Sequence, residues 1–114
     1  MRLDTLTLTS SNLQRSRAFY NGKLGFRVIE EGDAAFVVDA GGVKLQVGHV
    51  DRHGLKAPLT LTEPRLVFDT KELAARCMQL RDLGVSVDGP RKADAGQFAE
   101  LSDPDGHPIV LWEK

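Results

Sequence analysis

Few residues in this sequence are of the types that usually carry chemistry in proteins. It has three histidines, one cysteine and one tryptophan among 114 residues. His49 and His53 have a spacing that would put two metal ligands on one face of a helix, but glycines on both sides of the pair indicate a loop. His107 directly follows a turn, where we expect an exposed side chain. The spacing of the histidines therefore predicts no metal site.

Cys77 lies among apolar residues at helical spacing, which indicates a buried packing residue and not a nucleophile. A lone cysteine excludes a disulfide framework and favours a reducing compartment. The first residues lack the apolar core of a signal peptide, and no apolar run approaches membrane-spanning length. We therefore expect a cytoplasmic protein with no membrane partner.

Length and charge direct attention to a small-molecule site. The 114 residues are enough for one domain, and 15 basic residues balance 16 acidic ones at a pI of about 6.3. This balance favours no nucleic acid, and the short basic pair Arg91-Lys92 is typical of solvated surface. Neither a phosphate-binding glycine loop nor a nucleophile elbow is present in the sequence.

The last sixteen residues, from Ala99 to Lys114, predict a β-hairpin. Its turn is Asp103-Pro104-Asp105-Gly106, in which the proline fixes φ and the glycine supplies a positive φ. The carboxylate of Asp103 is placed to accept hydrogen bonds from the turn amides. Apolar, β-forming residues flank the turn on both sides.

The elements that must position any site follow from apolar spacing and turn residues. The first half predicts a strand over residues 3–9, a helix from Leu13 to about Lys23, capped by Ser11 or Asn12 and ended by Gly25, and strands over 26–30, 35–38 and 43–47. After a polar connection over 51–58, the second half predicts a strand over 65–68, a helix over 72–83 ended by Gly84, and strands over 85–87, 96–101 and 109–112.

The two halves match at an offset of about sixty residues, for example Leu6 with Leu66, which indicates a duplicated βαβββ unit. We predict an α+β fold in a single domain, 1–114, with modules at about 1–50 and 62–114. The modules would form one curved, mixed, eight-stranded sheet around a cleft. In each first strand, alternation puts one set of side chains toward the helix and the other set on the uncovered face: Thr5, Thr7 and Thr9, and then Arg65, Val67 and Asp69.

Two segments at opposite ends of the chain carry a family resemblance. Residues 13–20, LQRSRAFY, continuing to the LGF of residues 24–26, together with the turn at 103–106, closely resemble the vicinal oxygen chelate superfamily. That superfamily includes glyoxalase I, bleomycin-resistance proteins and extradiol dioxygenases. The resemblance implies paired βαβββ modules around a cleft and a homodimer, and it is not specific for one reaction.

The resemblance also locates four metal-ligand positions, two histidines and two glutamates in the metal-dependent members. In this sequence they fall on Thr5, Gln46, Arg65 and Val110. Valine offers no donor, and the guanidinium of Arg65 is a fixed positive charge without a lone pair. We therefore expect no metal and no other cofactor.

The same positions suggest a different use for the cleft. Arg65 would put a cation where the metal lies in relatives, with Thr5, Thr7 and Gln46 as neutral hydrogen-bonding groups and Trp112 as a stacking surface. These five residues are the predicted ligand site, suited to an anionic or polar molecule. The structural alternative is that Arg65 only forms an ion pair with Asp69 or Glu100.

Three functions stay open, and the sequence does not decide whether the protein is an enzyme. The first is a metal-independent small-molecule-binding protein of the antibiotic-sequestering or ligand-sensing kind. The second is a metal-dependent lyase or dioxygenase of glyoxalase type with displaced ligands. The third is a metal-free isomerase that uses Glu63 or Glu100 as its base.

Overall fold

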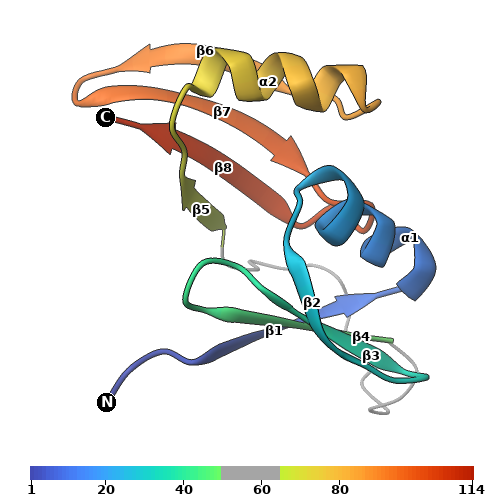
Figure 1. Ribbon diagram of the computed structural model, residues 1–114. Coiled ribbons are helices and arrows are strands. Elements are labelled where there is room, and N and C mark those ends of the chain that lie inside the picture. Colours follow the sequence, from blue (N-terminus) through green and yellow to red (C-terminus); the bar gives the residue numbers. More distant parts are fainter. Residues whose placement is uncertain (50–64) are drawn as a thin grey trace. The chain divides into compact units, whose positions relative to one another are not determined.

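The computed structural model describes residues 1–49 and 65–114 (Figure 1). The chain divides into two compact units, Met1–Leu61 and Thr62–Lys114, and each is described by itself. The predicted connection over residues 51–58, His53 and Glu63 lie outside the described residues.

Both units have the same order of elements and the same sheet topology. The first contains β1 (Thr5–Ser10), α1 (Leu13–Arg17), the π-helix η1 (Ala18–Lys23), β2 (Arg27–Glu31), β3 (Ala35–Asp39) and β4 (Lys44–His49). The second contains β5 (Leu66–Asp69), α2 (Leu73–Asp82), β6 (Asp88–Ala93), β7 (Gly96–Ser102) and β8 (Pro108–Glu113). The sheet orders are β1-β4-β3-β2 and β5-β8-β7-β6, and only the β1–β4 and β5–β8 pairs are parallel.

This repetition confirms the predicted α+β class and the two βαβββ modules. The expectation of one eight-stranded sheet is wrong at the level of strand pairing. Each strand pair found among the described residues joins two strands of one module, so the strands form two four-stranded sheets. Apolar alternation predicts which face of a strand is buried, but it does not specify where a sheet ends.

The helix of the first module begins as predicted and ends with wider turns. The side chain of Asn12 caps α1 by accepting a hydrogen bond from the amide of Arg15 at 3.0 Å. From Ala18 onward the helix is of the π type, and the adjacent Phe19 and Tyr20 on it are both buried, with their rings edge to face at 5.1 Å. A hydrogen bond of 2.7 Å between the buried hydroxyls of Ser10 and Ser16 ties β1 to α1.

Each core lies between a sheet and its helix. In the first unit the buried set includes Leu8, Phe36, Val38, Leu45 and Val47, while Thr5 and Thr7 are exposed, as the alternation predicted. In the second unit Leu73, Cys77 and Leu80 of α2 are fully buried. Burial raises the pKa of the Cys77 thiol, so this cysteine is a protonated packing residue.

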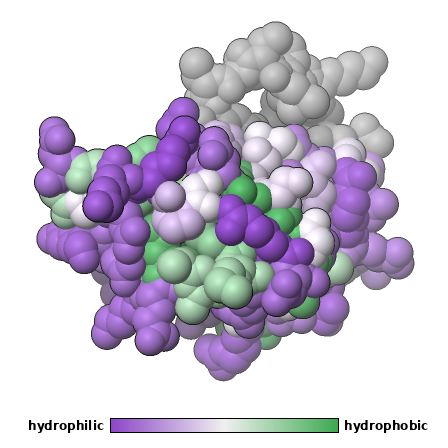
Figure 2. All heavy atoms as spheres, turned by 90° about the horizontal axis from the view of Figure 1, so that it is seen from above, coloured by the Kyte–Doolittle hydropathy of each residue, from purple (hydrophilic) through white to green (hydrophobic). Residues whose placement is uncertain are grey.

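Exposed large apolar side chains are few among the described residues. They are Met1, Leu3, Val67, Met78 and Leu83. The face drawn in Figure 2 is mostly hydrophilic and surrounds a smaller hydrophobic area. None of the described helices is long and apolar enough to span a lipid bilayer.

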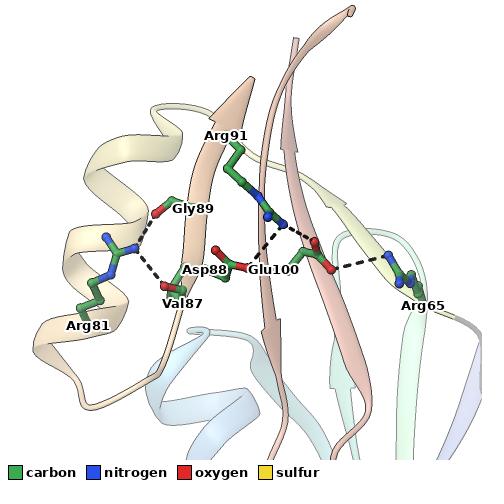
Figure 3. Close-up of polar contacts among 7 residues, drawn as sticks. All are labelled: Arg65, Arg81, Val87, Asp88, Gly89, Arg91 and Glu100. Carbon is green, nitrogen blue, oxygen red and sulfur yellow. Dashed lines mark hydrogen bonds and ion pairs between the residues drawn. The ribbon is translucent and has the colours of Figure 1, made fainter. Parts of the chain in front are cut away.

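Residues 85–87 do not form the predicted strand, because residues of α2 form hydrogen bonds with the backbone of this segment. The amide of Val85 donates to the carbonyl of Leu80 at 2.9 Å. The guanidinium of Arg81 donates to the carbonyl of Val87 at 2.9 Å and also to that of Gly89 (Figure 3). The strand is β6, which starts at Asp88 and is polar because it is an edge strand of the second sheet.

The C-terminal hairpin forms as predicted, with one difference. Asp103 accepts hydrogen bonds from the amides of Asp105 and His107 at 2.9 and 2.8 Å, and Gly106 has a φ of 88°. The expectation of an exposed His107 is wrong, because its side chain is only 4% exposed and lies 3.8 Å from the carboxylate of Asp103. The turn folds back on its first aspartate, which brings the histidine into the interior.

Candidate functional site

The predicted site residues of the first unit share one face of its sheet. Thr7 is the register partner of Gln46, and Thr5 lies two residues before it on the same strand. Both threonines are exposed and Gln46 is half-buried. The hydroxyl of Thr5 donates to Asp4 at 2.7 Å, and Lys44 lies 3.9 Å from the same carboxylate. These groups make a polar, uncharged row with an ion pair at one end.

The predicted site residues of the second unit also share a face, which we call the helix-free face because α2 packs on the other side of the sheet. Val67, Val110 and Glu100 lie side by side across β5, β8 and β7, and the next row contains Asp69, Trp112 and Phe98. Arg65 precedes β5 and projects to this face by alternation. Trp112 and Phe98 are half-buried. The result is an aromatic and aliphatic surface with charged groups along it.

Two arginines of the helix-free face share one carboxylate, as Figure 3 shows. Arg65 Nη1 lies 3.6 Å from one oxygen of Glu100, and Arg91 Nη2 donates to the other at 2.6 Å. Arg91 also lies 3.4 Å from Asp88 and places its guanidinium 5.1 Å from the centre of the Phe98 ring. We call Arg65, Glu100 and Arg91 the arginine–glutamate row.

The structural alternative for Arg65 is therefore present, with Glu100 and not Asp69 as the partner. The contact does not hide the arginine, since its side chain remains 63% exposed. An exposed ion pair of this kind contributes about 0–1 kcal/mol. Arg65 thus has a weak internal partner and N–H donors available to a ligand. Glu100, held by two guanidinium groups, is poorly placed to act as a free general base.

The structure brings the five predicted residues into two groups, Thr5, Thr7 and Gln46 in one unit and Arg65 and Trp112 in the other. That the groups share one cleft stays a prediction. Sequence reasoning missed Arg91 and Phe98. Phe98 could have been found from its even spacing to Glu100 within a predicted strand, whereas Arg91 could not, because its strand was predicted in the wrong place.

The residues at the family's metal positions do not fit a metal ion. Val110 is a half-buried hydrocarbon side chain, and Arg65 brings a positive charge that would repel a divalent cation. Within residues 1–49 and 65–114, no three His, Cys, Asp or Glu side chains gather in a way that could hold a metal.

A separate hollow of about 240 Å³ lies in the first unit between the start of α1 and the β2–β3 turn. The ion pair of Arg17 and Glu31 lines it, together with Leu13, Gln14 and Phe36. None of the predicted site residues contributes to it. It is open to solvent, and Arg17 and Glu31 are already paired with each other.

The chain belongs to the Glyoxalase/Bleomycin resistance protein/Dioxygenase superfamily, whose model matches residues 2–111. This confirms the resemblance drawn from the two terminal motifs. No curated protein gives a significant match.

Several solved structures match almost the whole chain. TnmS3, an antibiotic binding protein from Streptomyces sp. CB03234, is 28% identical over 99% of this chain and 95% of its own, with a TM-score of 0.78. A glyoxalase/bleomycin resistance protein from the same organism is 28% identical over 97% of this chain and 99% of its own, with a TM-score of 0.73. A glyoxalase family protein from Enterococcus faecalis, 24% identical over 98% and 97% with a TM-score of 0.81, shows the shared fold.

Proposed function

We propose that this protein is a metal-independent small-molecule-binding member of its superfamily, which holds an anionic or polar ligand on the helix-free face. In this proposal Arg65 binds the anionic or polar group and Trp112 supports the apolar or ring-shaped body. We keep Thr5, Thr7 and Gln46 in the proposal as the neutral hydrogen-bonding residues that the sequence predicts. The observation that carries the proposal is an exposed arginine beside an apolar, aromatic sheet surface.

The chemistry of that surface supports the class of ligand. A guanidinium is a planar fork of donors that pairs with a carboxylate or phosphate through two parallel hydrogen bonds. Trp112 and Phe98 are register partners, so both rings lie on the face that carries Arg65, with the guanidinium of Arg91 over the ring of Phe98. A ligand with an oxyanion on a ring would satisfy both parts at once.

The relatives support binding of a small molecule. TnmS3 is described as an antibiotic binding protein, and it matches this chain over nearly its full length. Metal independence is supported by the chemistry of Thr5, Gln46, Arg65 and Val110, which does not suit a divalent ion. We further propose a cytoplasmic homodimer, in line with the family and with the single buried cysteine.

The test is to screen small carboxylates, phosphates and neutral ring compounds by thermal shift in the presence of a chelator, and to titrate the hits by calorimetry. Arg65→Ala is expected to weaken binding of an anionic hit by roughly 10- to 100-fold, because a charge-assisted hydrogen bond is lost. Arg2→Ala removes the same charge at an exposed position of the other unit and serves as the matched control. Unchanged affinity in Arg65→Ala would remove this residue from the site.

A further inference from the structure

The arginine–glutamate row has an arrangement that a simple surface ion pair does not need. A single carboxylate, that of Glu100, contacts both Arg65 and Arg91, one with each oxygen (Figure 3). The two arginines come from segments far apart in the sequence, one before β5 and one in β6. The pairing of β7 with its neighbours therefore places a carboxylate-sized group between two guanidinium groups.

The groups around Glu100 are suited to bind both the ring and the carboxylate of an aromatic carboxylate. Val110 is its register partner on β8, and the next row holds the rings of Phe98 and Trp112. Phe98 also carries the guanidinium of Arg91 over its ring. A ring lying against Val110 and Trp112 would hold its carboxylate at the arginines, where the carboxylate of Glu100 now lies.

Glu100 is reached by solvent, although Arg91 binds one of its oxygens closely, at 2.6 Å. Its side chain is 36% exposed, and its contact with Arg65 is long, at 3.6 Å. Arg91 keeps a second acidic partner in Asp88 at 3.4 Å. Moving the Glu100 carboxylate into solvent would therefore free donors on both arginines without leaving Arg91 unpaired.

We propose that Glu100 is an internal counterion that occupies the carboxylate subsite of this face, so that an aromatic carboxylate binds by displacing it from Arg65 and Arg91. This inference rests on the proposed function and adds to it the ligand's chemical class, a second binding arginine and a residue that sets selectivity. Glu100 lowers the affinity for every anion by competing for the same donors. A neutral ring compound cannot replace the negative charge of Glu100 at the two arginines. Displacing Glu100 therefore does not increase its affinity.

The experiment uses the full chain and two probes of nearly equal shape, 4-nitrobenzoate and the neutral 4-nitrobenzyl alcohol. Trp112 is the only tryptophan, so quenching of its fluorescence reports binding on this face. Glu100→Gln keeps the size of the side chain and removes its charge. We expect it to tighten binding of 4-nitrobenzoate by about tenfold or more and to leave the neutral probe nearly unchanged.

A matched control separates this effect from the change in net charge. Asp82→Asn removes one negative charge at the exposed end of α2, on the other side of the sheet, and should leave both affinities as they are. Arg91→Gln in the wild-type background should weaken binding of 4-nitrobenzoate but not of the alcohol.

Equal or weaker binding of 4-nitrobenzoate to Glu100→Gln would overturn the inference and leave the proposed function in place, provided that the wild type binds either probe. Failure of both probes to bind both the wild type and Glu100→Gln would contradict the proposed function itself.

Discussion

Glu113 near the C-terminus completes the start of a helix that lies about forty residues earlier in the chain. Its carboxylate accepts hydrogen bonds from the backbone amides of Glu72 and Leu73 at 2.7 and 3.2 Å, and from the side chain of Gln97 at 2.8 Å. Glu72 has a left-handed backbone and no side-chain cap of its own. Glu113 thus satisfies donors at the N-terminus of α2 that local residues leave open.

Replacing this residue, Glu113→Gln, is expected to lower the stability of the folded protein in a pH-dependent way. The helix amides and Gln97 hold the pKa of Glu113 below its ordinary value of 4.5, since they favour the charged form. Its contribution is therefore fully present above the unfolded-state pKa and is lost as the pH falls through the folded-state value. Urea unfolding of both proteins from neutral pH downward measures this.

The difference in the free energy of unfolding between the wild type and Glu113→Gln should decrease as the pH falls below 4.5. A difference that stays constant over this range, or that widens, would show that the carboxylate does not stabilise the fold through its charge.

Single-residue environments were the hardest feature to predict from the sequence. The role of Asp103 followed from local turn chemistry, which four neighbouring residues determine. The pairing of Arg65 with Glu100, the cap from Glu113 and the burial of His107 all depend on tertiary contacts or on the register of strands. That register is set by the whole sheet and is not visible in a local pattern.

At the level of elements, the pairing of β7 with β8 depends on a close approach of backbones at Gly96. A Cβ at this position would overlap the carbonyl oxygen of Glu113 and lie 2.9 Å from Cα of Lys114. Gly96 therefore lets β7 begin directly against the end of β8. Any side chain here would push the two strands apart at the point where Gln97 and Glu113 pair.

Gly96→Ala is expected to destabilise the protein by about 1–3 kcal/mol, as overpacking against backbone atoms does. Gly22→Ala is the matched control, because a Cβ there meets no atom within 4 Å and the residue lies in a helix. The control should be neutral or up to about 1 kcal/mol more stable. Chemical denaturation of the two variants gives the comparison, and equal stabilities would contradict the close approach.

The sequence predicted most elements because their patterns are local. Alternation located β1, β3 and β4, and the caps and glycines bounded both helices to within a few residues. The same alternation of apolar residues predicted the strand after α2 at residues 85–87. It did not predict β6, whose residues are mostly polar. An edge strand needs little apolar character, whereas the apolar residues before it pack beneath the end of a helix.

At the level of the whole molecule, the duplicated module would explain the metal-free binding that we propose. Each module buries a core between its sheet and its helix, and Thr5 and Arg65 are exposed residues outside these cores. Residues there can change from ligands such as histidine to Thr5 or Arg65 without exposing the core. The family fold then carries over to this chain, while the chemistry of the face is its own.

Metal analysis combined with binding measurements tests the proposal that a small molecule binds without a metal. The protein, purified without an affinity tag, is incubated with zinc, nickel, manganese or iron salts, freed of excess, and analysed by mass spectrometry. Ligand affinity is then measured on the same samples with and without a chelator. We predict substoichiometric metal in every sample and the same affinity throughout. One tightly held ion per chain, with binding that disappears in the chelator, would contradict metal-independent binding.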